Sequence, residues 1–137
     1  MVPQTLSFPG GSLCCAITHL DSGAVITTDA PKDLKGDGSS FSPTDLLCSA
    51  LASCIVTTMA LWARKKGFEL GAVTAHIEKH MTTSLPRTIA RVVVDLRFAS
   101  AYTPEQQQVL IDAAHGCPVA LALRNEVQQD VRFAWAG

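Results

Sequence analysis

The sequence predicts one α+β domain over residues 1–137, with a mainly antiparallel sheet and a long central helix. Three observations predict this class. An uncharged, mostly apolar run spans residues 46–63, residues 73–78 and 90–98 alternate between apolar and polar, and turn-rich segments join successive strands as hairpins. The predicted order β-β-α-β-β-α-α-β favours α+β architecture. A chain of 137 residues suits a single domain that buries a core without disulfides or metals.

Residues 13–18 and 24–28 are the first two predicted strands. Asp21, Ser22 and Gly23 between them have the composition of a hairpin turn, in which glycine readily adopts positive φ. The following segment, 29–42, is polar and glycine-rich and is predicted to be a loop.

A long helix is predicted to begin at Ser42, a good N-cap, followed by Pro43 and by Asp45 in the first turn. It should run to about Lys66 and stop at Gly67. Its uncharged stretch just reaches the length of a membrane span, but its serines and threonines favour a buried core helix. Apolar residues cover nearly every face, and the rest of the chain is too small to hide them. We therefore expect a homodimer with these helices at its centre.

Residues 73–78 and 90–98 are predicted strands, with a turn at 84–87. Thr103, Pro104 and Glu105 predict the start of a second helix that runs to about His115. Residues 118–125 form a short third helix, and 127–135 a closing strand.

Composition and charge exclude several classes of protein. Hydrophobic residues make up 47% of the chain and charged residues 17%, which excludes intrinsic disorder. The net charge of −1 leaves no excess of positive charge that would attract nucleic acid or an anionic membrane, so we expect neither as a partner. The N-terminal residues lack the basic start and apolar run of a secretory signal, so we expect a cytoplasmic protein with reduced thiols.

Five cysteines stand at positions 14, 15, 48, 54 and 117, with no C-x-x-C pair. A single cysteine in an apolar helix, such as Cys54, is usually a small core residue. Cys117 is more suggestive, because it precedes Pro118 at a helix start, where unpaired N–H groups favour thiolate. His115 could add positive charge there when protonated. From position alone, structural and functional readings of both cysteines remain open.

His76, Glu78 and His80 would share one face of a strand, where they could ligate a transition metal. The alternative is a solvated polar face, which we favour, so no metal is expected. No glycine-rich phosphate loop, Ser-His-Asp arrangement or H-E-x-x-H motif is present.

Two segments together resemble the cysteine signatures of the OsmC/Ohr family, the osmotically inducible and organic hydroperoxide resistance proteins. The first is FSPTDLLCSALASC at residues 41–54, and the second is AHGCPV at residues 114–119. The order and spacing of the predicted elements are similar to the family over nearly the whole chain.

The resemblance implies an intertwined homodimer with active sites at the subunit interface. It implies a thiol peroxidase in which Cys54 is the peroxidatic and Cys117 the resolving cysteine. An organic hydroperoxide would be the substrate and an external thiol the reductant, with no other cofactor.

One departure concerns the charge around Cys54. Peroxide-reducing family members carry a glutamate ten positions before the cysteine that corresponds to Cys54, and this glutamate pairs with an N-terminal arginine. Here Thr44 occupies that position, Asp45 would point elsewhere on the helix, and the first arginine in the chain is Arg64. Thr44, Asp45 and His115 are therefore only auxiliary candidates. The departure keeps a second function open, a non-peroxidase dimer that binds a small apolar or thiol-bearing ligand at the subunit interface.

Overall fold

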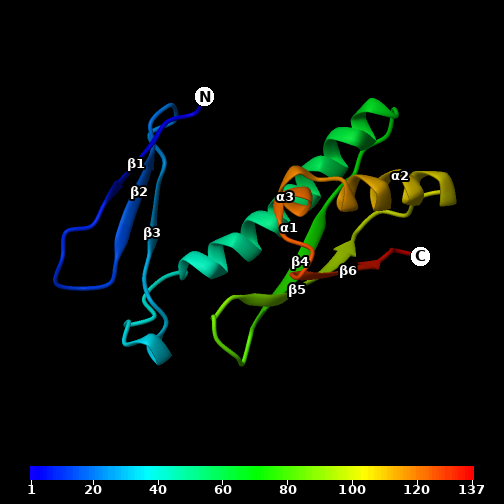
Figure 1. The fold of residues 1–137 in the computed structure, drawn as a ribbon. Coiled ribbons are helices and arrows are strands. Elements are labelled where there is room, and N and C mark those ends of the chain that lie inside the picture. Colours follow the sequence, from blue (N-terminus) through cyan, green and yellow to red (C-terminus); the bar gives the residue numbers. More distant parts are fainter. The chain divides into compact units, whose positions relative to one another are not determined.

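The computed structural model describes all residues, 1–137, and divides into two units, residues 1–46 and 47–137 (Figure 1). Each unit contains a three-stranded sheet. The α+β class predicted from the sequence is confirmed, with three of the four strand pairings antiparallel.

The first sheet consists of β1 (Gln4–Ser7), β2 (Cys15–His19) and β3 (Val25–Thr28), paired in that order. The predicted β2–β3 hairpin is confirmed, and Gly23 adopts φ 74° in its turn. β1 was not predicted, because its short sequence has little apolar alternation. It is defined only by its hydrogen bonds to β2.

The loop after β3 is organised around the buried carboxylate of Asp29. Asp29 accepts hydrogen bonds from the Ser39 backbone N–H at 3.0 Å, from the Ser39 hydroxyl at 2.8 Å and from the Ala30 N–H at 2.8 Å. The hydrogen bonds from Ser39 lower the pKa of Asp29 most, because they favour the ionised carboxylate. The loop, which includes the short 3-10 helix Lys32–Leu34, is therefore tied to the end of β3.

The long helix α1 (Pro43–Lys65) begins and ends within one residue of its predicted limits. Ser42 and Asp45 form reciprocal hydrogen bonds at its start. The Ser42 N–H donates to Asp45 Oδ2 at 2.9 Å, and the Asp45 N–H donates to Ser42 Oγ at 3.1 Å. These bonds satisfy backbone groups that the first helical turn leaves without partners.

The single chain buries α1 on one side only. Its buried residues form one stripe at helical spacing, whereas Leu47, Leu61 and Trp62 are exposed. The buried residues are Cys48, Leu51, Ala52, Ile55, Met59 and Ala63. By length and composition alone α1 would qualify as a membrane span, but its stripe forms the centre of the core of residues 47–137.

The second sheet contains β4 (Val73–Met81), β5 (Ile89–Phe98) and β6 (Gln128–Ala134), with β5 in the middle. β4 and β5 form an antiparallel hairpin, as predicted. β6 is parallel to β5, because the helices α2 (Pro104–His115) and α3 (Pro118–Ala122) return the chain to the opposite end of the sheet.

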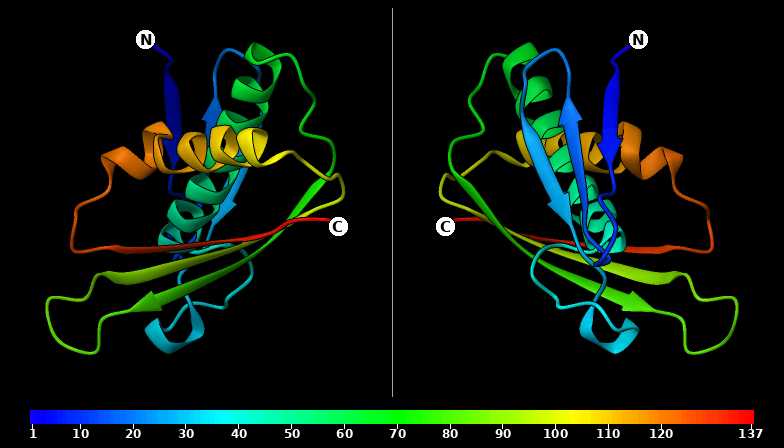
Figure 2. Two further views of the ribbon diagram at one scale, coloured as in Figure 1. Left: turned by 90° about the vertical axis from the view of Figure 1, so that its right-hand side faces the viewer. Right: turned by 90° about the vertical axis from the view of Figure 1, so that its left-hand side faces the viewer.

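Helices α1, α2 and α3 all lie on one face of the second sheet (Figures 1 and 2). The alternation in β5 predicts this layering, because alternate residues from Val92 to Phe98 enter the core cluster with the helix residues. Thr103 caps α2, as predicted, and the structure adds a capping box with Gln106. α3 ends at Ala122, three residues earlier than predicted. The core therefore lies between the helices and the sheet, and it includes Cys48 and Cys117.

Candidate functional site

Cys54 lies in the middle of α1, at the edge of the buried stripe. Its side chain is half-buried and packs against the core cluster. Its Sγ lies 3.9 Å from the Oγ1 of Thr58, one helical turn further along. Residues i and i+4 of a helix lie on the same face, which explains the contact. Cys54 is thus both held in place and reachable from the surface of residues 47–137.

Cys117 is fully buried and is the N-cap of α3. Its Sγ accepts a hydrogen bond from the Ala120 N–H at 3.4 Å. Burial raises the pKa of the Cys117 thiol most, and Cys54 raises it further through a hydrogen bond and through charge. N–H groups of the α3 start act in the opposite direction. Cys117 is therefore held mainly as a protonated thiol, next to Cys54.

The structure thus brings together the two cysteines that the resemblance singled out. They come from α1 and from the α2–α3 junction, separated by 62 residues in sequence, and both are free thiols. Neither has a lysine or arginine partner. The other three cysteines lie elsewhere, with Cys15 as the first residue of β2, Cys14 directly before it and Cys48 in the core.

The auxiliary candidates have other contacts. Thr44 and Asp45 take part in the start of α1, where the Thr44 hydroxyl lies 3.1 Å from Ser42 Oγ. His115, the last residue of α2, is exposed, and its ring packs edge-to-face on Phe133 with centroids 6.2 Å apart. The polar neighbour of Cys54 is instead Thr58, which the sequence interpretation overlooked. The i+4 spacing from Cys54 was the signal that could have identified it.

A groove of about 400 Å³ lies between α1 and α2. Trp62, Val109 and Ala113 give it an apolar wall, and Lys66 and Asp112 add one charge of each sign. Gly116, the residue before Cys117, also lines it. The groove is large enough for a small organic molecule.

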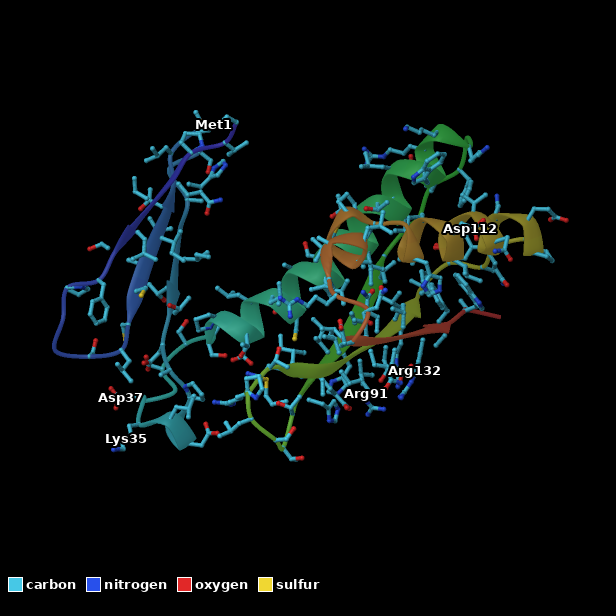
Figure 3. All side chains as sticks on the ribbon, viewed as in Figure 1. Met1, Lys35, Asp37, Arg91, Asp112 and Arg132 are labelled. Atoms are coloured by element: carbon cyan, nitrogen blue, oxygen red, sulfur yellow. The ribbon has the colours of Figure 1, made fainter.

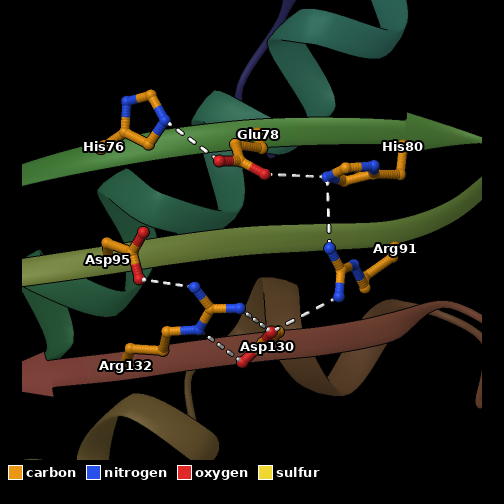
Figure 4. Close-up of polar contacts among 7 residues, drawn as sticks. All are labelled: His76, Glu78, His80, Arg91, Asp95, Asp130 and Arg132. Carbon is orange, nitrogen blue, oxygen red and sulfur yellow. Dashed lines mark hydrogen bonds and ion pairs between the residues drawn. The ribbon is translucent and has the colours of Figure 1, made fainter.

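The sheet face opposite the helices carries a connected series of charged and imidazole side chains (Figure 4). Glu78 contacts His76 Nε2 at 3.3 Å through one carboxylate oxygen and His80 Nε2 at 2.9 Å through the other. Arg91 lies 3.4 Å from the same His80 nitrogen. A metal ion ligated by these residues would meet a guanidinium there, and no three His, Cys, Asp or Glu side chains converge on one point.

Asp130 joins the arginines of this face, and Figure 3 shows Arg91 and Arg132 on the side of the sheet away from α2. Arg132 makes two hydrogen bonds to Asp130, at 2.6 and 3.2 Å, and contacts Asp95 at 3.5 Å. Arg91 lies 3.8 Å from Asp130. The hydrogen bonds from Arg132 hold the pKa of Asp130 below its ordinary value.

We expect Asp130→Asn to destabilise the protein at pH 7 and to have little effect in acid. Because the pKa of Asp130 is lower in the folded state, its ionisation stabilises the fold above the ordinary aspartate pKa of about 3.9. This contribution is lost as the pH falls through the lowered folded-state value. Urea unfolding of both proteins at several pH values measures the difference. Asp21→Asn, in the exposed β2–β3 turn, is the control, and a pH-independent loss in Asp130→Asn would contradict the prediction.

Fold and cysteine pair together define an α+β protein with two adjacent thiols, one on its long helix and one at the start of α3. The model of the OsmC-like protein family matches residues 36–132, and the chain belongs to this family. Among functionally curated proteins, none matches the sequence.

Solved structures agree with this assignment. A Psychrobacter arcticus protein, described as osmotic stress induced and as part of a detoxification response, is 33% identical. The match covers 97% of this chain and 96% of that one, with a TM-score of 0.90. The OsmC-like protein of Mycoplasma pneumoniae is 17% identical, with 100% and 98% coverage and a TM-score of 0.81. The organic hydroperoxide resistance protein OhrB of Bacillus subtilis is 19% identical, with 97% coverage of each chain and a TM-score of 0.70. The last two likenesses establish the fold alone.

Proposed function

We propose that this protein is a thiol peroxidase that reduces organic hydroperoxides, with Cys54 as the peroxidatic and Cys117 as the resolving cysteine. One observation carries the proposal: a half-exposed thiol and a fully buried thiol are neighbours in one structure. The exposed thiol can meet a substrate, and the buried one can reach only its neighbour. The family assignment and the hydroperoxide resistance named for relatives of the same fold add support.

The proposed reaction has two steps. The Cys54 thiolate attacks the terminal oxygen of the hydroperoxide, the O–O bond breaks, and the alkoxide takes a proton to leave as an alcohol. Cys54 is then a sulfenic acid. The Cys117 sulfur displaces its oxygen as water and forms a Cys54–Cys117 disulfide. Two electrons from an external thiol reductant restore both thiols, so no further cofactor takes part.

The surroundings of Cys54 favour an organic substrate over hydrogen peroxide. Its side chain packs against the hydrophobic core cluster, and Val56 and Val119 border the same cluster. An alkyl group can bury its surface there, whereas hydrogen peroxide has none to bury.

We further propose a cytoplasmic homodimer as the working form. Apolar side chains remain exposed on both units, including Leu61 and Trp62 on α1 and Ile26 on β3. A second copy of the chain would cover them. Sedimentation at low micromolar concentration is expected to give about twice the chain mass of 14.6 kDa, and a stable monomer would contradict the dimer.

Mass spectrometry of reduced protein treated with cumene hydroperoxide tests the reaction itself. A Cys54–Cys117 disulfide should form with one equivalent of oxidant and disappear on addition of dithiothreitol. Protein that shows neither this disulfide nor a Cys54 sulfenic acid is not a peroxidase of the proposed kind.

The lack of a cationic partner at Cys54 favours one alternative function, a dimer that binds a small apolar or thiol-bearing ligand. The groove beside Trp62 offers a volume for such a molecule. Under this alternative Cys54→Ser retains ligand binding and wild-type protein fails the cumene hydroperoxide test. A large loss of binding in Cys54→Ser would count against it.

A further inference from the structure

Thr58 has a hydroxyl group whose single polar contact is the sulfur of Cys54. The Oγ1–Sγ distance is 3.9 Å, and Thr58 has no other side-chain hydrogen bond. Its side chain is half-buried, so protein as well as water surrounds the contact. The hydroxyl of a threonine in a helix often donates to the backbone carbonyl of the residue one turn earlier. For Thr58 that residue is Cys54, but the hydroxyl contacts the Cys54 side chain instead.

The direction of the hydrogen bond follows from the charge on sulfur. A neutral thiol and a hydroxyl can each donate weakly to the other. A thiolate has no proton and can only accept, so the Thr58 O–H must then donate. Hydrogen bonds to charged groups are stronger than those between neutral groups, so the Oγ1–Sγ contact would be stronger with a thiolate than with a thiol.

The buried Cys117 thiol, held mainly protonated beside Cys54, is a second possible donor to the Cys54 sulfur, but Thr58 is the hydroxyl group that contacts it. Neither cysteine has a lysine or arginine partner, and the N–H groups at the start of α3 act on Cys117. We propose that Thr58 is a catalytic residue of this chain, whose hydroxyl donates a hydrogen bond to the Cys54 thiolate and so supplies the reactive form of the nucleophile. This inference rests on the proposed function, but it concerns thiol ionisation and can be tested without a peroxide.

The test is the pH dependence of Cys54 alkylation in wild-type protein and in Thr58→Val and Thr58→Ser. Iodoacetamide reacts with the thiolate, and peptide mass spectrometry follows each cysteine separately. Valine keeps the shape of threonine without its hydroxyl, and serine keeps the hydroxyl. Thr57→Val, at the exposed neighbouring position of α1, is the matched control.

We expect Thr58→Val to move the midpoint of the Cys54 profile upward by about 0.5 to 1 pH unit, and so to slow alkylation at pH 7 about threefold to tenfold. Rates should converge at strongly alkaline pH, where loss of the proton no longer limits alkylation. Thr58→Ser and Thr57→Val should follow the wild type. The Cys15 profile within each sample should not move.

An unchanged midpoint in Thr58→Val overturns the inference. So does a slower reaction by the same factor at every pH, because that outcome reports altered access to Cys54 and not altered ionisation. Failure of the proposed function looks different. Wild-type protein would then form no Cys54–Cys117 disulfide with cumene hydroperoxide, whatever the alkylation profiles show.

Discussion

Cys54→Ser is expected to lower the rate of organic hydroperoxide reduction at least about a thousandfold, since removing the proposed nucleophile leaves only the weak assistance of the remaining site. A serine hydroxyl is almost entirely protonated at neutral pH and is a poor nucleophile toward an O–O bond. The exchange preserves size and leaves the half-buried position polar, so the fold should persist. Peroxide consumption with dithiothreitol as reductant measures the loss, and circular dichroism monitors the fold.

Cys117→Ser should behave differently, and the contrast identifies the two roles. Cys54 would still react once with hydroperoxide, but its sulfenic acid would persist because no second thiol lies beside it. A dimedone adduct on Cys54, detected by mass spectrometry, is the expected result. Cys15→Ser, a change in β2, should leave turnover within twofold of the wild type. If Cys117→Ser lost the first reaction and Cys54→Ser kept it, the assigned roles would be reversed.

Local patterns were sufficient to predict most of the elements. The alternation in β5, the Thr103 capping sequence and the long apolar run of α1 each predicted an element whose existence and type the structure confirms. β1 escaped prediction because a four-residue strand is specified by its partner β2 and not by its own residues. The parallel pairing of β6 also depends on how far α2 and α3 carry the chain.

Residues alone did not pair Cys54 with Cys117, and the resemblance to a family supplied that pairing. Their separation in sequence means that only the packed core brings them together. The network between Glu78, Arg91, Asp130 and Arg132 likewise requires the register of three strands. The contact between Cys54 and Thr58 is different, because helix periodicity determines it once α1 is predicted.

Leu51→Ala is expected to lower the free energy of unfolding by about 2–5 kcal/mol, the usual cost of truncating a fully buried leucine. Leu51 is 0% exposed and lies in the buried stripe of α1, between Cys48 and Ile55. Alanine has a high helix propensity, so α1 itself should still form. The cost comes from lost burial and from the cavity that the surrounding side chains fill only partly. Urea unfolding at one protein concentration, followed by tryptophan fluorescence, measures it.

Leu121→Ala is the matched control, because it makes the same chemical change on a helix at a side chain that is 72% exposed. There the alkyl group is already largely in water, so its removal should change the free energy of unfolding by about 0.5 kcal/mol or less. Both variants change helix propensity in the same way, so the difference between their free energies of unfolding measures the effect of burial. A Leu51→Ala protein as stable as Leu121→Ala would show that the stripe of α1 is not the core of residues 47–137.

Since Cys54 packs against that same core, the Leu51 variant should also lose the fixed placement of Cys54 beside Cys117, and with it fast disulfide formation.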